Sequence, residues 1–507
     1  MDIRPDTFSE ISGSDIFFTK SANLSSFLTQ NLSTLLLVRP LSSFSSVFVA
    51  FLLSSSIETM AQPPSKRARH STDTPNKNGD EDDKDEIIKA LKAEMAELRD
   101  RDEMYYASSD CMLPQSTHHS VPKKGFPASH VKERIVQLHE LDNKPRLNTS
   151  SYVNVIQEPE ESDMALLGLG TNLADASVYP ASVQIHDTVV DMIAKLWNCP
   201  EPDVGQVNYS GSGTVGSTEA CLLAGLALKF RWREWYKKQY GLSSEEVVKV
   251  MPNLVISSCY QAAWEKFFRY FDVTPRFVKP TLANKMRIDP NDLLELIDEK
   301  TLGVVAILGN HYNGAYDPVW EMNDRIEELN KRNDYQIGIH IDAASGGFIA
   351  PFQDDMPAFD FRLKNVLSIS ASGHKFGESS CGTGWLVFRH RHDLAEHIAV
   401  SVTYLGGKSD SITLNFSRPA TSAYVQYYKL LRLGMTGFKK KVEQQMAITK
   451  YIRDHLKKCT LNGKPRFEIL DAGDEHCLPV LAARLNPNLH LKYNDIDLQH
   501  AMAEYHW

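Results

Sequence analysis

The sequence predicts an α/β fold with an open sheet, and two segments indicate it. Residues 338–347 have the pattern of a buried strand that ends in a loop of small residues, with Asp342 where the strand stops. Residues 211–220 are rich in glycine and favour a turn, which a helical run follows at 221–237. Because ligands of open α/β sheets bind at the carboxyl ends of strands, we expect Asp342 to face a ligand.

Residues 370–375, Ser-Ala-Ser-Gly-His-Lys, are the most informative motif in the chain. The amine of Lys375 can form a Schiff base with an aldehyde, and the side chains of Ser372 and His374 suit a phosphate that lies across a tight turn. Pyridoxal 5′-phosphate has both groups. The alternative is an ordinary surface loop, but Asp342 supplies the carboxylate that keeps a pyridine nitrogen protonated, and the two residues together favour the cofactor.

The glycine-rich segment contains G-x-G-x-x-G at 211–216, a pattern that dinucleotide-binding folds share. Such a fold needs an acidic residue at the end of the next strand, about 20 residues on, and that distance still falls inside the predicted helix. The lysine of a nucleotide P-loop is missing as well. We therefore expect Ser217 and Thr218, at a helix N-terminus, to bind the cofactor phosphate.

Five motifs, in this order along the chain, resemble the glutamate decarboxylases, which are pyridoxal-phosphate enzymes of the aspartate aminotransferase-like fold (fold type I). They are GTVGSTEACLLAGLALKFRWRE, YQAAWEKFFRYFDV, HIDAASGGFIAPF, SISASGHKFG and TLNFSRPA. The resemblance runs from about residue 148 to the end of the chain. It implies a mostly parallel seven-stranded sheet between helices, a smaller C-terminal α/β domain, and decarboxylation of L-glutamate to 4-aminobutyrate and carbon dioxide.

The resemblance also implies roles for single residues around the cofactor. Lys375 would hold the aldehyde, Gln261 would stack on the pyridine ring, and Ala344 would support the opposite face. Ser417 would reach the phosphate of a neighbouring subunit, which implies a homodimer or larger homo-oligomer with shared active sites. Tyr404 would lie in a loop that closes the site and would help to return a proton to the substrate.

Substrate contacts are implied for a second group of residues: Ser151, Tyr152, Asn172, Asp175 and His311. Tyr152 and His311 depart from the family, which usually has Phe and Thr there. An acidic Asp175 beside an acidic substrate is compatible if one carboxyl is protonated, so we expect a preference for mildly acidic pH. The alternative role of Asp175 is to cap a turn or helix.

Composition narrows the class of protein. The 507 residues are 42% hydrophobic and 23% charged, which is typical of a globular protein. A net charge of -9 disfavours a nucleic-acid partner. Seven cysteines without metal-site spacing indicate reduced thiols, no metal site and a cytoplasmic protein.

We expect four regions along the chain. Residues 1–125 form a largely disordered extension with one charged helix at 83–104, and 126–190 form an arm that carries substrate contacts. Residues 191–435 form the large cofactor-binding domain, and 436–507 form a small domain. The apolar runs within 1–59 are shorter than the roughly 20 residues of a membrane span, so no membrane contact is expected; one interpretation is that translation begins at Met60.

The resembled family continues beyond the position of Trp507. The small domain is therefore expected to be incomplete, without an arginine implied to hold the substrate α-carboxylate and without a calmodulin-binding tail. Alternatives remain at this point: decarboxylation of aspartate or cysteine sulfinate, a truncated non-catalytic paralogue that pairs with an intact subunit, and a nucleotide-binding oxidoreductase, which residues 211–216 alone support.

Overall fold

A computed structural model describes residues 88–93, 121–122, 124–149, 156–394, 400–402, 409–473 and 476–505. Ser151, Tyr152 and Tyr404 lie outside these residues, as do the first 59 positions. Of the charged helix predicted at 83–104, residues 88–93 are described, and they are helical.

The chain divides into two compact units. Leu53–Asp142 make up one unit, which contains α3 (Ala128–His139), a helix without a buried residue. Met1–Leu52 and Asn143–Trp507 make up the other, which holds every strand among the described residues. The four domain boundaries expected from the sequence stay a prediction.

A seven-stranded sheet in the order β1-β7-β6-β5-β4-β2-β3 is the centre of the second unit. Its strands are β1 (Gly211–Val215), β2 (Asn253–Ser257), β3 (Thr274–Val278), β4 (Thr301–Ile307), β5 (Ile339–Asp342), β6 (Val366–Ser372) and β7 (Thr383–Phe388). Strands β2 to β6 pair in parallel, whereas β7 is antiparallel to both β1 and β6. The predicted mostly parallel seven-stranded sheet is confirmed.

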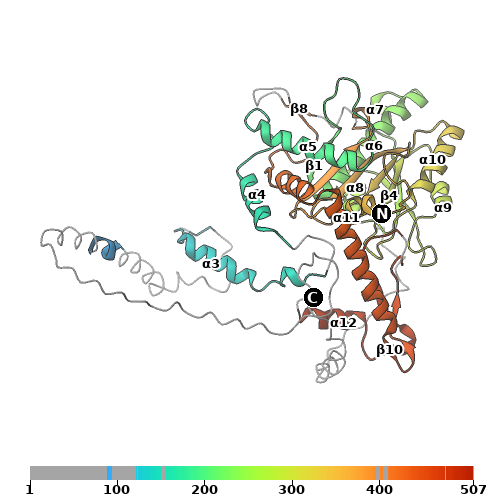
Figure 1. Cartoon of the computed structure of the whole chain (residues 1–507). Coiled ribbons are helices and arrows are strands. Elements are labelled where there is room, and N and C mark those ends of the chain that lie inside the picture. Colours follow the sequence, from blue (N-terminus) through green and yellow to red (C-terminus); the bar gives the residue numbers. More distant parts are fainter. Residues whose placement is uncertain are drawn as a thin grey trace, which may run out of the picture. The chain divides into compact units, whose positions relative to one another are not determined.

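Helices cover both faces of this sheet (Figure 1). The longer ones are α4 (Pro159–Leu169), α5 (Pro180–Leu196), α6 (Gly216–Tyr240), α8 (Ala262–Tyr270), α10 (Val319–Asn333) and α11 (Thr421–Lys458); α7 (Ser244–Val247) and α9 (Pro290–Glu295) are short. Ile339 and Ile341 of β5 join the core under α5, α10 and α11. Because side chains alternate along a strand, His340 and Asp342 lie on the opposite face, where α6 and α8 pack.

Residues 211–215 of the glycine-rich segment form a strand and not the expected turn, which corrects that part of the prediction. They are β1, whose backbone pairs with β7 from Gly211↔Val387 to Val215↔Thr383. The chain turns only at Gly216, with φ +74°, and α6 begins there rather than at Cys221. A side chain would not fit on the facing strand, because a Cβ on Gly384 would lie 2.3 Å from the Gly216 carbonyl carbon. This close approach places the start of α6 against β7.

The last part of the chain continues from α11, which bends at Gly434 (φ 59°, ψ -176°). Four short strands follow, β10 (Thr460–Leu461), β11 (Lys464–Pro465), β12 (Phe467–Ile469) and β13 (Ala483–Leu485), together with α12 (Asp495–Ala503). The four strands form two two-stranded sheets, β10-β11 and β12-β13. A separate pair of strands, β8 (Val400–Val402) and β9 (Ser409–Ser411), precedes α11. Within the described residues, no helix combines the length and apolar character needed to cross a bilayer.

An ion pair joins α4 to α11 in the interior. Lys429 Nζ lies 2.7 Å from Glu161 Oε2, and the two side chains are only 5% and 2% exposed. Removal of one partner of a buried pair leaves the other charge without compensation, which is more costly than removal of both.

We therefore expect Lys429→Met to lower the free energy of unfolding by about 3–5 kcal/mol, measured by guanidinium chloride unfolding. The double variant Lys429→Met/Glu161→Gln should lose clearly less free energy of unfolding, because neither member of the pair then remains as an uncompensated charge. Lys450→Met is the control, since its pair with Asp454 is exposed and contributes roughly 0–1 kcal/mol. Equal losses in the single and double variants would contradict this account.

Candidate active site

Three neighbouring parallel strands end close to one another at the same edge of the sheet. In the backbone register, Asp342 of β5 pairs with Ile307 of β4 on one side and with Ser370 of β6 on the other. The loops that follow β4, β5 and β6 therefore leave the sheet at one edge. They carry His311, Ala344 and Lys375, so the structure brings these predicted residues to the same edge.

Two N–H groups hold the carboxylate of Asp342. The indole Nε1–H of Trp264 donates to Oδ2 at 2.9 Å, and the backbone N–H of Ala344 donates to Oδ1 at 3.1 Å. Asp342 is only 5% exposed, so water does not readily replace these donors. The carboxylate is thus fixed in orientation before any ligand arrives.

Lys375 follows β6 by three residues. Its Nζ donates to Ser345 Oγ at 3.4 Å. Burial lowers the pKa of Lys375 below that of an ordinary lysine, although the nearby carboxylate of Asp342 acts in the opposite direction. A lower pKa leaves more of the amine unprotonated near neutrality, and the unprotonated amine is the form that attacks an aldehyde.

The predicted phosphate-binding residues meet where α6 begins. Ser372 Oγ donates to Ser217 Oγ at 2.7 Å, which joins the end of β6 to the first turn of α6. Thr218 follows in that same turn. His374 donates its Nδ1–H to the carbonyl of Thr383 at 2.9 Å, and burial lowers its pKa. Two hydroxyls at a helix N-terminus are suited to bind an anion.

Gln261 and His311 complete this part of the site. Gln261 is the N-cap residue of α8 and lies directly before the helix that carries Trp264. His311 lies after β4, where its ring centroid is 4.1 Å from that of Tyr312. The pKa of His311 is lowered by burial and then by Lys375, while Asp342 raises it. His311 is therefore within electrostatic reach of both charged groups.

Asn172, Asp175 and Ser417 form a separate group. Asn172 Nδ2 donates to Ser417 Oγ at 3.3 Å, and its Oδ1 accepts the backbone N–H of Arg418 at 3.2 Å. Asp175 Oδ1 accepts from Ser177 Oγ at 2.8 Å and from the N–H of Val178 at 3.2 Å, so it caps its own turn. Within the described residues, these three side chains form their hydrogen bonds with one another's segments and not with Lys375 or Asp342.

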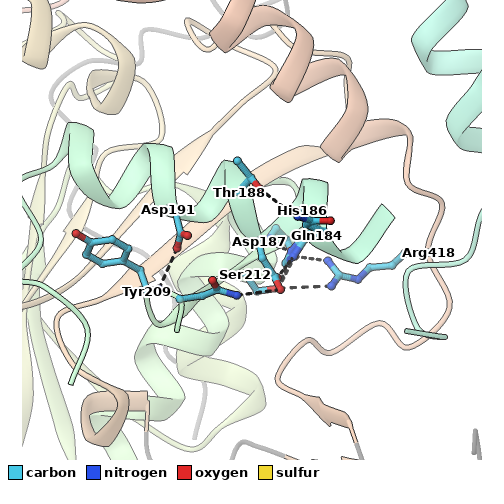
Figure 2. A network of polar contacts seen from close by, with 10 residues as sticks. Gln184, His186, Asp187, Thr188, Asp191, Tyr209, Ser212 and Arg418 are labelled. Atoms are coloured by element: carbon cyan, nitrogen blue, oxygen red, sulfur yellow. Dashed lines mark hydrogen bonds and ion pairs between the residues drawn. The ribbon is translucent and has the colours of Figure 1, made fainter. Parts of the chain in front are cut away.

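A polar network fixes β1 close to Arg418 (Figure 2). His186 donates Nδ1–H to Asp187 Oδ1 at 2.9 Å, and its Nε2 accepts the N–H of Gly213 at 2.8 Å. Ser212, His186 and Asp187 resemble a nucleophilic triad, and they line a cavity of about 440 Å³. However, Ser212 donates its hydroxyl proton to the Gly213 carbonyl, and Gly213 occupies Nε2. The network is therefore structural.

Sequence reasoning missed three buried residues beside Asp342. Trp264 donates to its carboxylate, and Cys221 lies 3.6 Å from Ser370 Oγ. His340 contacts Ser368 and Ser370 at 2.8 and 3.1 Å, and burial lowers its pKa to about 4. The available signal was spacing: His340 is two positions before Asp342 on a strand, and Trp264 is three positions after Gln261 on a helix.

Taken together, the edge of the sheet offers an amine, a fixed carboxylate and a hydroxyl pair at a helix N-terminus. A phosphorylated aromatic aldehyde with a ring nitrogen has one group for each of them.

Comparison with known proteins agrees with this chemistry. The sequence family described as the pyridoxal-dependent decarboxylase conserved domain matches residues 160–483. The chain is similar to glutamate decarboxylase of Lactococcus lactis subsp. cremoris, with 38% identity over 378 residues, 74% of this chain and 78% of the relative. Glutamate decarboxylase of Petunia hybrida is 38% identical over 367 residues, 72% of this chain and 70% of the relative.

Solved structures show the same relationship. Glutamate decarboxylase of Lactobacillus brevis superposes with a TM-score of 0.69 and 34% identity, covering 77% of this chain and 86% of that one. A sphingosine-1-phosphate lyase of Burkholderia pseudomallei superposes with a TM-score of 0.62 at 19% identity, covering 78% of this chain and 85% of that one. At that identity the second match concerns the fold alone.

The lowered pKa of Lys375 predicts how the protein captures an aldehyde as pH changes. The rate at which cofactor-free protein captures pyridoxal 5′-phosphate should rise with pH and level off below 10.5, the ordinary lysine value. The sign follows because only the neutral amine reacts and burial favours the neutral form. Stopped-flow absorbance measures the rate, with N-acetyl-lysine amide as the reference and Lys375→Ala as the control. A rate that follows the reference over the whole pH range would contradict the prediction.

Proposed function

The chain belongs to the pyridoxal-dependent decarboxylase family, and from this premise we propose that it converts L-glutamate to 4-aminobutyrate and carbon dioxide at the site around Lys375. The observation that carries the proposal is the meeting of Lys375, Asp342 and the Ser217–Ser372 pair at one edge of the sheet. The relatives named above that are 34% identical or more are glutamate decarboxylases.

The residues present fit pyridoxal 5′-phosphate. Lys375 would hold the aldehyde carbon, and Asp342 would accept a hydrogen bond from the protonated ring nitrogen. Ser217, Thr218, Ser372 and His374 would bind the phosphate, while Gln261 and Ala344 would lie on the two faces of the ring. When bound, the cofactor supplies an electron-withdrawing ring that accepts the electron pair left behind as the carboxylate departs.

The protein contributes orientation and charge to this chemistry. Asp342 would stabilise positive charge at the ring nitrogen, and its two N–H donors hold the carboxylate in place. The lowered pKa of Lys375 favours the neutral amine, which would bind the aldehyde and would also serve to accept or return a proton. We assign help in protonating the α-carbon to Tyr404, which lies outside the described residues.

Substrate recognition involves the second group of residues. We assign Asn172, Asp175 and Ser151 to the distal carboxyl group of the substrate, with Tyr152 and His311 beside them. The hydrogen bond between Asn172 and Ser417 supports a common location for Asn172 and Ser417, the serine proposed to reach the partner's cofactor phosphate. The role of Asp175 as a turn cap is compatible with this assignment, because a fixed carboxyl can still present its second oxygen. The preference for mildly acidic pH stays a prediction.

We also propose that the active unit is at least a homodimer in which Ser417 serves the partner's cofactor. The exposed apolar side chains of α4 support it: Leu166, Leu167 and Leu169 are 67%, 61% and 63% exposed. On α11, which packs on α4, Leu431 and Met435 are 57% and 63% exposed. Exposed apolar side chains on two packed helices are typical of a surface that a protein partner covers. We place the enzyme in the cytoplasm, which the free cysteines among the described residues support.

Release of carbon dioxide from three acids tests the substrate. We expect L-glutamate to react at least about tenfold faster than L-aspartate, which is one methylene shorter, and faster than L-cysteine sulfinate. Lys375→Ala should abolish release from all three. A faster reaction with aspartate or cysteine sulfinate would show that the substrate is wrong. A protein that holds the cofactor but releases no carbon dioxide from any acid would instead be a pairing subunit.

Mixing of variants tests the shared site. Lys375→Ala is expected to be inactive, and Ser417→Asp should repel the phosphate of the partner's cofactor. A mixed dimer has one site with both Lys375 and Ser417 intact, so random exchange should restore roughly a quarter of the wild-type activity. Mixing Lys375→Ala with Asp342→Asn is the control, because both residues belong to one chain's site and no intact site forms. Recovery of activity in neither mixture, or equal recovery in both mixtures, would contradict the proposal.

A further inference from the structure

We propose that Trp264 is a positioning residue for the cofactor: its indole N–H orients the Asp342 carboxylate and thereby sets the strength of the contact between Asp342 and the pyridine nitrogen. The inference rests on the proposed function, because it assigns Asp342 to that nitrogen. It adds a residue that touches neither cofactor nor substrate and acts through Asp342.

The geometry around Asp342 leaves its carboxylate little freedom. Each oxygen accepts one N–H, from Trp264 at 2.9 Å and from Ala344 at 3.1 Å. Rotation of the carboxylate about its Cβ–Cγ bond would break at least one of these hydrogen bonds. Asp342 is 5% exposed, so a broken hydrogen bond would leave a buried charge poorly solvated. Of the two donors, only the indole belongs to a side chain that substitution can remove.

Packing holds the indole itself. Trp264 is fully buried, and its ring centroid lies 5.7 Å from the ring centroid of Phe267 and 5.5 Å from that of His340. Phe267 packs tightly against α6, because a Cβ added at Gly225 would lie 2.4 Å from its ring. His340 is in turn fixed by hydrogen bonds with Ser368 and Ser370. The indole therefore cannot turn away from Asp342 without displacing its neighbours.

Helix α8 links the hydrogen bond between Trp264 and Asp342 to the residue proposed to lie on the face of the pyridine ring. Gln261 is the N-cap residue of α8, and Trp264 follows one turn later, so both side chains move with the same helix. The helix that is proposed to place Gln261 on the ring thus also orients the partner of the ring nitrogen. A small displacement of α8 would change both contacts together.

The other groups around Asp342 do not duplicate this role. Cys221 lies nearby on α6, but a thiol is a weak donor, and burial raises its pKa well above the ordinary value. Lys375 carries an amine that the proposed function assigns to the aldehyde. Among the described residues around this carboxylate, Trp264 is the side chain with a strong neutral N–H donor to it.

Two variants and two cofactors test the inference. Trp264→Phe keeps an aromatic ring but removes the N–H. Trp232→Phe is the matched control: Trp232 is 3% exposed and donates its indole N–H to the Glu299 carbonyl at 3.0 Å, away from Asp342. Dissociation constants are measured for pyridoxal 5′-phosphate and for its 1-deaza analogue, in which carbon replaces the ring nitrogen.

We expect Trp264→Phe to raise the dissociation constant of pyridoxal 5′-phosphate by about tenfold or more, since hydrogen bonds to charged groups have this magnitude. Trp232→Phe should change it by less than roughly twofold. With the 1-deaza analogue, Trp264→Phe and wild type should bind alike, because no ring nitrogen remains for Asp342 to contact. A loss of the same size with both cofactors, or an equal loss in Trp232→Phe, would overturn the inference.

Two further measurements keep the outcome clear. If Trp264→Phe does not fold, as judged by circular dichroism, benzothienylalanine at position 264 replaces only the N–H by sulfur, and the same expectations apply. Wild type alone decides the proposed function: failure to bind pyridoxal 5′-phosphate would overturn both proposals. Binding and carbon dioxide release from glutamate in wild type, with no selective effect at Trp264, would overturn this inference only.

Discussion

The backbone register of β5 between β4 and β6 is the constraint on which the rest of the site depends. It sets Asp342 level with Ile307 and Ser370, so three loops leave the sheet at one edge. A shift of one residue would turn Asp342 to the other face, into the core formed by Ile339 and Ile341. The hydrophobic alternation that stabilises the sheet therefore also specifies which face carries the chemistry.

The same alternation makes one face of the central strands polar. Ser368, Ser370 and Ser372 of β6 lie on the face that His340 and Asp342 share, and all of them are buried. Buried polar groups are costly unless they form hydrogen bonds, and here they bond to one another or to helices α6 and α8. The helices on this face thus do more than cover the sheet. Helix α6 provides Ser217 and α8 provides Trp264, each from the side that contacts the strands.

Much of the site could be predicted from the sequence because its signals are local. Asp342 ends a short apolar strand, and Lys375 follows a run of small polar residues, so both positions can be recognised without knowledge of distant contacts. The strand at 211–215 could not be recognised, because glycine is a poor strand former and pairing with the distant β7 decides its conformation. Trp264 was missed for a similar reason. Its spacing from Gln261 places both residues on one helix, but that spacing does not show that α8 packs over the end of β5.

The substrate residues illustrate a different limit. Asn172 and Asp175 were assigned through resemblance, yet in one chain their hydrogen bonds are local or lead to the Ser417–Arg418 segment. The shared site proposed for Ser417 involves a second subunit, which a single sequence does not describe. The residues around Lys375, by contrast, come from one chain, in which Ser217, Asp342 and Lys375 meet at the same edge of the sheet.

The most direct test of this account is to identify the lysine that binds the cofactor. Protein loaded with pyridoxal 5′-phosphate is reduced with borohydride, which makes the bond between cofactor and amine permanent, and the modified peptide is identified by mass spectrometry. The account predicts the phosphopyridoxyl group on Lys375. Modification of a different lysine, or none in a folded protein, would contradict it.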